Sequence, residues 1–169
     1  MKTMYKKTIL ITFIVILLDQ LSKGLIDKYI ATGESIKVID KLFYLTNISN
    51  TGAAWGMLPD KTNLLVVLTV IVLIILIQYM QMFKNNNRNI LAFGLLYGGI
   101  LGNLIDRLFL GYVKDFLEFH IFDYIFPIFN ISDICIVIGA ILLIIAIING
   151  EDKKIGIKSA KYRRKRTAR

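Results

Sequence analysis

The stretch Leu64-Leu-Val-Val-Leu-Thr-Val-Ile-Val-Leu-Ile-Ile-Leu-Ile77 is apolar at every position except Thr69. A second stretch, Ile134–Ile148, is aliphatic apart from Cys135 and Gly139. A helix that crosses the hydrocarbon core of a bilayer needs roughly 20 mostly apolar residues, and both stretches reach that length with their flanks. Soluble cores do not need such runs, so these segments predict an integral membrane protein of mainly α-helical fold.

Two further apolar segments are interrupted by polar residues. Thr8–Leu18 is followed by charged residues from Asp19 onward, and Ile90–Leu101 is followed by polar residues from Asn103 onward. Charge at membrane depth is costly and usually marks function, so these two segments are the informative ones. Together the four segments predict transmembrane helices at roughly 8–26, 63–83, 90–108 and 132–149.

The whole composition agrees with a membrane class. The chain has 169 residues, 56% of them hydrophobic, with a mean hydropathy of +0.62; the length indicates one domain, residues 1–169. The N-terminal lysines and apolar run resemble a secretory signal peptide. However, Asp19-Gln-Leu-Ser-Lys23 stands where a small-residue cleavage site would lie, so we interpret the segment as a retained span. A single cysteine gives no disulfide framework.

The net charge of +9 is unevenly distributed. The N-terminus carries +3, the turn at 84–89 carries +2 and the tail 150–169 carries +7, whereas 110–133 carries −3. The positive-inside rule therefore predicts cytoplasmic termini and outward connections. The cluster Lys161–Arg166 is also typical of nucleic-acid binding, but topology and attraction to anionic lipid explain it more simply. We expect membrane lipid as a partner and no nucleic acid.

The two outward connections differ in character. Residues 27–62 contain β-rich runs bounded by turn residues, which predict a small sheet at the outer membrane surface. Residues 109–131 are mixed and aromatic, and we expect an outer loop there. His120, the only histidine, has no second His or Cys nearby to build a zinc site; we interpret it as an ordinary loop residue and expect neither metal nor cofactor.

The third predicted span has a small face and a polar end. Its glycines at positions 94, 98 and 102 share one helical face and permit another helix to approach closely. Asn103 and Arg107 share a face, with Asp106 beside them. Arg107 would then either mark the helix end and pair with Asp106 or join a polar cluster near a site. Asn103 favours the cluster, because a lipid-facing amide would be unpaired.

Two aspartates flank the second outward connection. Taken singly, Asp115 is a solvated loop acid and Asp133 an N-terminal helix cap. The topology places both at the outer ends of adjacent spans, near the lipid boundary. Two partly desolvated carboxylates that lie close together cannot both ionise. Such a pair can activate a water and protonate a leaving amine, which is the chemistry of metal-free peptide hydrolysis.

Five motifs in this chain occur in one order, and they span nearly its whole length. They are Asp19-Gln-Leu-Ser-Lys23, Asn50-x-Gly-Ala-Ala-Trp-Gly56, Gly102-Asn103-x-x-Asp106-Arg107, Val113-x-Asp115-Phe116 and Phe129-Asn130-Ile-Ser-Asp133. In these motifs, and in its four predicted spans, the chain resembles lipoprotein signal peptidase, also called signal peptidase II.

The resemblance implies a bacterial enzyme of the cytoplasmic membrane, a target of globomycin, that removes signal peptides from prolipoproteins. It would cut before a diacylglyceryl-modified cysteine, near the outer leaflet, as a monomer. It implies Asp115 and Asp133 as the catalytic pair. It further implies nine residues that hold the substrate or support the site: Asp19, Lys23, Asn50, Gly52, Gly102, Asn103, Asp106, Arg107 and Asn130. Residues 27–62 would form the family's outer β-cradle and residues 116–128 its mobile outer loop.

Two departures from the family pattern bear on the pair. Ser132 stands where alanine is usual and would add a hydrogen bond that alters the titration of the pair, and Trp55 stands where phenylalanine is common. Because Asp133 lies near a helix N-terminus, we expect it to ionise more readily, leaving the proton more often on Asp115.

Other function classes fit this sequence less well. A small ion-coupled transporter or channel subunit would use intramembrane charges as a relay, but these gather near one membrane face. An interaction protein would use the glycine face for helix association, which leaves Asp115, Asn130 and Asp133 without a role. Presenilin-like proteases carry a Gly-x-Gly-Asp signature that this sequence lacks.

Overall fold

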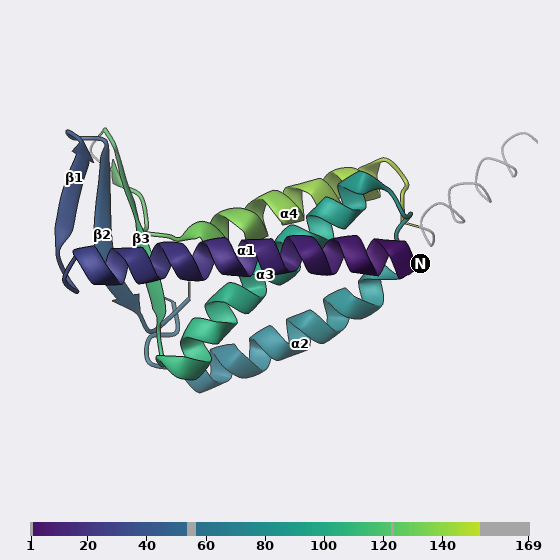
Figure 1. The fold of residues 1–169 in the computed structure, drawn as a ribbon, viewed down its shortest axis with the longest axis horizontal. Coiled ribbons are helices and arrows are strands. Elements are labelled where there is room, and N and C mark those ends of the chain that lie inside the picture. The colour runs from purple at the N-terminus through teal and green to yellow at the C-terminus, as the bar shows by residue number, and fades with distance from the viewer. Residues whose placement is uncertain (1, 54–56, 123, 153–169) are drawn as a thin grey trace, which may run out of the picture.

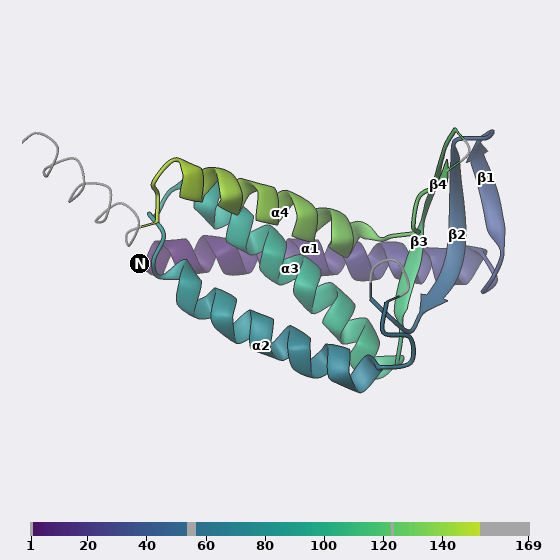
Figure 2. The same ribbon diagram turned by 180° about the vertical axis from the view of Figure 1, so that it is seen from behind.

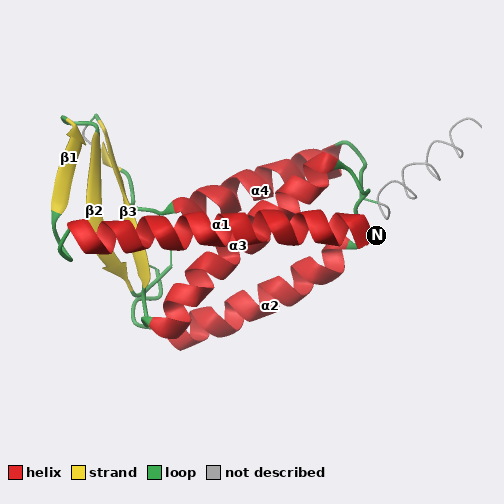
Figure 3. Cartoon of the chain, in the orientation of Figure 1, coloured by secondary structure: helices red, strands yellow, loops and turns green. Residues whose placement is uncertain are grey.

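The computed structural model describes residues 2–53, 57–122 and 124–152. Trp55 and most of the basic tail lie outside this range. In chain order the elements are α1 (Lys2–Tyr29), β1 (Ser35–Ile39), β2 (Phe43–Asn50), α2 (Thr62–Met80), α3 (Asn87–Phe109), β3 (Val113–Ile121), β4 (Tyr124–Ile125) and α4 (Ile131–Ile148). Within the described residues, four helices are long and apolar enough to cross a membrane. With the small sheet, they confirm the predicted fold class (Figure 3).

Helix α1 is longer than its predicted span. Its 28 residues correspond to about 42 Å, whereas the hydrocarbon core is about 30 Å thick. The surplus projects past the other helices and crosses one face of the sheet (Figure 1). There Ile26 and Ile30 pack against Phe116, with Leu45 at the edge of the cluster. This apolar contact fixes the sheet relative to the helices.

Helix α3 is the centre of the bundle and contacts the other three helices (Figure 2). The predicted glycine face packs against α1. A Cβ atom added at Gly94 would lie 2.6 Å from Ile11 Cγ2, and one added at Gly98 would lie 2.5 Å from Val15 Cβ. Real Cβ atoms do not approach so closely, so only glycine lets the two helices come this near.

The four strands form one antiparallel sheet in the order β1-β2-β3-β4. They run across the direction of the helices, with β1 farthest from the bundle and β3 close to it (Figures 1 and 2). In the β2–β3 register, Ile48 pairs with Asp115 and Asn50 pairs with Val113. Strands β1 and β2 fall in the β-rich runs of the first connection.

The prediction that residues 109–131, including the mobile stretch 116–128, form a loop is wrong. Residues 113–121 are a nine-residue strand that pairs with β2, and 124–125 form a short fourth strand. The physical reason is that β2 offers backbone groups that need partners, and Val113–Ile121 supplies them with Val113 and Phe116 buried. His120 is therefore a strand residue; its Nε2 lies 2.6 Å from Glu118 Oε1.

Candidate active site

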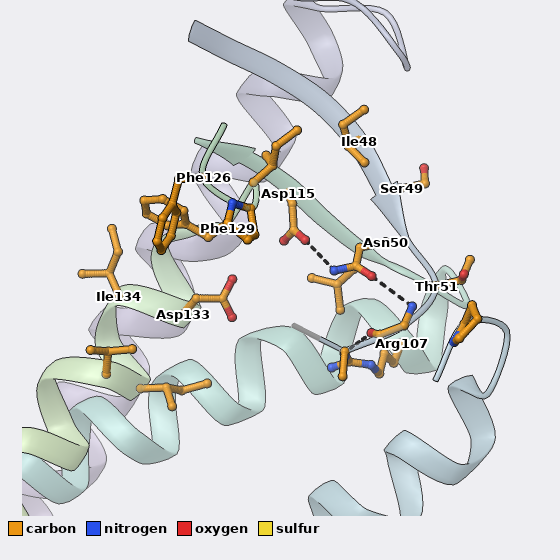
Figure 4. Close-up of a pocket in the computed structure, with 18 of the residues that line it drawn as sticks. Ile48, Ser49, Asn50, Thr51, Arg107, Asp115, Phe126, Phe129, Asp133 and Ile134 are labelled. Carbon is orange, nitrogen blue, oxygen red and sulfur yellow. Dashed lines mark hydrogen bonds between the residues drawn. The ribbon is translucent and has the colours of Figure 1, made fainter. Parts of the chain in front are cut away.

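An open pocket of about 970 Å³ lies where the sheet meets α3 and α4. Asp115 and Asp133 both line it, and in Figure 4 their carboxyl groups point into the same space. Asn50 and Arg107 line the side of the pocket opposite Asp133. Two acids that the chain separates by seventeen intervening residues thus share one pocket.

Asp115 is positioned by the β2–β3 pairing. Its carboxyl group accepts two hydrogen bonds, from Asn50 Nδ2 to Oδ2 at 2.8 Å and from Asn130 Nδ2 to Oδ1 at 2.7 Å. The residue is 3% exposed. Desolvation raises the pKa of Asp115 to about 6; the two amide donors lower it in part, and the negative charge of Asp133 adds to the increase.

Asp133 occupies the third position of α4, and the residue that caps this helix is Asn130. The prediction that Asp133 is the cap is therefore corrected. The two form a capping box: Asn130 Oδ1 accepts from the Asp133 backbone N–H at 3.0 Å, and Asp133 Oδ2 accepts from the Asn130 backbone N–H at 3.1 Å. Asp133 Oδ1 accepts a further bond from Asn103 Nδ2 at 2.8 Å. The first turn of the helix adds a field that favours a negative charge here.

Asn130 connects the two acids. Its side-chain amide donates to Asp115 and its side-chain oxygen accepts from Asp133, while its backbone N–H donates to the Asp133 carboxylate. The same amide also lies 3.1 Å from Asn103 Oδ1. Asn130 is fully buried, so it has little freedom to swing away. One residue thereby orients both carboxyl groups, Asp115 through its side chain and Asp133 through its backbone N–H.

Behind the pair lies a buried charged layer. Lys23 Nζ is 2.8 Å from Asp19 Oδ2, 2.9 Å from Asp106 Oδ2 and 2.9 Å from Asn103 Oδ1. The three charged residues are 2% exposed or less. The alternative in which Asp106 pairs with the neighbouring Arg107 is wrong, because Asp106 pairs with Lys23. The bonds Lys23–Asn103 and Asn103–Asp133 link this layer to the pair.

Gly102 makes room for this layer. A Cβ atom there would lie 2.7 Å from Asp19 Oδ2 and would also clash with Ser132 Oγ. Asp19 Oδ1 accepts from the Ser132 backbone N–H at 2.9 Å, which ties α1 to the start of α4. Within the described part of the chain Ser132 Oγ has no hydrogen-bond partner. The expected hydrogen bond from Ser132 that would alter the pair is therefore not formed.

Arg107 holds the loop after β2. Its Nη2 donates to the backbone oxygen of Gly52 at 2.9 Å, and the Gly52 N–H donates to Asn50 Oδ1 at 2.9 Å. The Nε of Arg107 is buried, and no partner for it is present among the described residues. The guanidinium therefore places a positive charge in the pocket wall.

Three residues that support the site were not predicted from the sequence: Gln20, Asp27 and Lys114. Gln20 Nε2 donates to Asp106 Oδ1 at 2.9 Å, and the Lys114 backbone N–H donates to Asp106 Oδ2 at 3.1 Å. The Lys114 ammonium pairs with Asp27 Oδ2 at 2.7 Å. A signal for Asp27 was present, because it follows Lys23 by one helical turn; Lys114 gave none, since its role depends on the strand.

The comparison with protein families decides the assignment. The model of signal peptidase (SPase) II matches residues 11–149, which include every site residue described above. The chain belongs to this family. Membership confirms the resemblance seen in the five motifs, sets aside the transporter and association alternatives, and makes the chain a bacterial membrane protease.

Relatives in the signal peptidase II family match over most of their length. The chain is 41% identical over 149 residues to the lipoprotein signal peptidase of Anoxybacillus flavithermus, covering 88% of this chain and 89% of that protein. It is 42% identical over 147 residues to that of Halothermothrix orenii, covering 87% and 97%. A solved structure of a bacterial membrane enzyme superposes with a TM-score of 0.78 at 40% identity, covering 84% of this chain and 87% of the other.

Proposed function

We propose that this chain removes the signal peptide from bacterial prolipoproteins by hydrolysing the peptide bond before a diacylglyceryl-modified cysteine. Asp115 and Asp133 would be the catalytic pair. The main support is that both carboxyl groups face one pocket and are joined through Asn130, in a chain 41% to 43% identical to proteins named lipoprotein signal peptidase.

The two acids have environments that suit different roles. Asn103 and Asn130 each donate a hydrogen bond to the Asp133 carboxylate, and the N-terminus of α4 adds a favourable field. All three interactions stabilise the charged form of Asp133. Asp115 is buried on a strand, and its pKa of about 6 favours the protonated form more than an ordinary aspartate does. A bound substrate would exclude water and favour the protonated form further. Asp133 is therefore the base and Asp115 the acid.

The reaction then proceeds in two steps. A water between the carboxyl groups attacks the peptide carbonyl carbon, gives one proton to Asp133, and the carbonyl oxygen receives the proton of Asp115. In the resulting tetrahedral diol, Asp133 returns its proton to the amide nitrogen and the carbon–nitrogen bond breaks. One hydroxyl proton passes back to Asp115 as the new carboxyl group forms. The pair ends in its starting protonation state.

The pocket walls fit a substrate that is half peptide and half lipid. On one side Asn50 and Arg107 present amide and guanidinium groups to a peptide backbone. On the other side the wall is apolar, formed by Phe126 and Phe129 and by aliphatic residues of α4 that include Val137. Val137 is 57% exposed, so the apolar wall continues onto the outside of the bundle. Acyl chains of a modified cysteine would remain in lipid while the peptide bond meets the acids.

The charge distribution supports an orientation with both termini in the cytoplasm and the pocket near the outer leaflet. The sheet-end connection 110–133 carries net −3, whereas the opposite end carries Lys6 and Lys7 of α1 and the bases Lys84 and Arg88 at the α2–α3 junction. The sequence that follows α4, 150–169, carries +7. The secreted precursor reaches the outer leaflet with its lipid anchor, so the acids would lie at the depth of the bond they cut. Protease protection of a tag on each terminus in intact cells tests this orientation.

Cleavage of a purified lipid-modified prolipoprotein in detergent tests the proposal. Asp115→Asn and Asp133→Asn should each lose roughly 10²- to 10⁴-fold in turnover, the usual contribution of a positioned acid or base. Asp40→Asn is the matched control, because Asp40 is exposed and bonds Lys37 on the sheet. Near wild-type turnover in either site variant would refute the pair, and equal cleavage of an unmodified precursor would refute the lipid requirement.

A further inference from the structure

The end of the sheet around β4 exposes a row of large apolar side chains, which we call the apolar strip: Ile121, Phe122, Tyr124, Ile125 and Phe126. Phe122 is 100% exposed, Ile125 58% and Tyr124 55%. These residues lie outside the four spans, so contact with lipid along a transmembrane helix does not account for them. An exposed apolar patch of this kind usually marks a contact surface.

The strip lies at the β4 edge of the sheet, the edge opposite β1. Strand β4 pairs with β3 on the edge opposite β2, and the labelled strands run from β1, farthest out, to β3, close to the bundle (Figures 1 and 2). The chain then returns along β3 to α4: the Phe126 N–H donates to Phe119 O and the Leu117 N–H to Phe129 O, both at 2.8 Å. The strip is therefore held next to the start of a membrane span.

The strip is continuous with the lipid-facing surface of α4. Tyr124 meets Phe126 edge to face at 6.5 Å between ring centroids, and Phe126 meets Phe129 at 5.7 Å. Phe126 and Phe129 share the pocket wall with Val137 and Ile138, which are 57% and 44% exposed on α4. Apolar side chains thus extend from α4 through Phe129 and Phe126 to Tyr124 in β4.

We propose that the apolar strip docks into the interfacial layer of the bilayer, beside the start of α4. Aromatic residues favour this layer, where a ring is shielded from water and a phenol hydroxyl meets headgroups. Strand β3 carries Asp115 and pairs with β4, so this contact sets the height of Asp115 relative to the lipid. Such docking requires only the four spans and the sheet, whatever reaction the pocket performs.

Tryptophan quenching by brominated lipid tests the docking. The chain has one tryptophan, so reporters are placed in a Trp55→Phe background: Phe122→Trp and Ile125→Trp on the strip, Phe13→Trp on the exposed face of α1, and Val38→Trp on β1. Phe13 and Val38 are 62% and 50% exposed. Each variant is reconstituted at low density in phosphatidylcholine vesicles with or without bromine on the acyl chains.

Docking predicts that both strip reporters lose most of their emission in brominated vesicles, as Phe13→Trp does, while Val38→Trp keeps its emission. Emission maxima of the strip reporters should also lie at shorter wavelength than that of Val38→Trp. Strip reporters that behave like Val38→Trp would overturn the proposal. Quenching by iodide in the aqueous phase is measured on the same vesicles. Protection of the strip reporters from iodide that appears only at high protein density would overturn the proposal, because it indicates contact with a second copy of the chain. Protection that appears only with added prolipoprotein would also overturn it, because it indicates contact with substrate.

Discussion

Burial of Asp115 has a consequence for stability that varies with pH. Its pKa is raised from 3.8 to about 6 in the folded protein. Below pH 3.8 the group is protonated in both the folded and the unfolded states and contributes no difference. As pH rises from 3.8 to about 6, the unfolded chain releases this proton first, so the folded state loses stability over that window. Above about pH 6 the loss is complete.

The size of the loss follows from the two pKa values. Each pKa unit corresponds to 1.36 kcal/mol, so the free energy of unfolding falls by about 3 kcal/mol across the window. Asp115 is 3% exposed, and solvent screening therefore reduces this figure little. For a chain of this length the change corresponds to roughly 6–12 °C in Tm. We predict that Asp115→Asn removes this part of the pH dependence.

The substitution also carries a constant cost. Both Asn50 and Asn130 donate to the carboxyl group, and an asparagine at 115 would turn its own amide toward one of these donors. The mismatch costs about 1–3 kcal/mol at every pH. The informative quantity is therefore the slope: the Tm of Asp115→Asn minus that of the wild type should rise between pH 4 and pH 7.

Thermal unfolding in detergent, followed by intrinsic fluorescence at closely spaced pH values, measures this difference. Asp40→Asn is the control, since Asp40 is exposed and its curve should run parallel to that of the wild type. A Tm difference between Asp115→Asn and wild type that stays constant from pH 4 to pH 7 would show that burial does not hold a proton on Asp115. A difference that falls with pH would reverse the sign of the argument.

Three further substitutions test the site and the helix packing around it, and a fourth serves as a control. Asn130→Leu should lower turnover roughly 10²-fold or more, because Asp115 loses the donor to its Oδ1 and the first turn of α4, which carries Asp133, loses its side-chain cap; steady-state cleavage measures it. Lys23→Met should cost about 3–5 kcal/mol of stability, because the buried carboxylates of Asp19 and Asp106 lose their positively charged partner. The Tm should therefore fall at neutral pH. Gly98→Val should cost about 1–3 kcal/mol through overpacking against α1. Gly24→Ala, with no atom within 4 Å of the added Cβ, should unfold at the wild-type temperature or above.

The helices and the first two strands were accessible from the sequence because their signals are local. Long apolar runs define the spans whatever they pack against, and residues 35–48 carry β-branched and aromatic side chains between turn residues. Strand β3 gave no such signal. Its partner β2 is 65 positions away at the Asn50–Asp115 contact, and its sequence Val113–Ile121 does not alternate cleanly between apolar and polar residues.

The sequence predicted which residues belong to the candidate site better than it predicted which of them contact each other. Asn103 and Arg107, four positions apart on one helical face, suggested a cluster, and the glycine at 102 suggested close packing. Sequence adjacency left open an Asp106–Arg107 pair as the alternative to a polar cluster, yet neighbours on a helix do not face each other. The partner of Asp106 is Lys23, which comes from another helix that the glycines admit. Pairings of this kind depend on tertiary contacts, and no local pattern contains them.

The double role of Asn130 makes the enzyme sensitive to the fraying of a single helical turn. The Asn130 side chain both caps α4 and donates to Asp115, and the Asn130 backbone N–H donates to Asp133. Opening the first turn therefore disconnects the pair even while the rest of the bundle stays folded. Heat or a poorly matched detergent would then silence catalysis well before global melting. Amide hydrogen exchange at residues 131–134 should follow this loss of activity with temperature, whereas exchange in the middle of α3 should not.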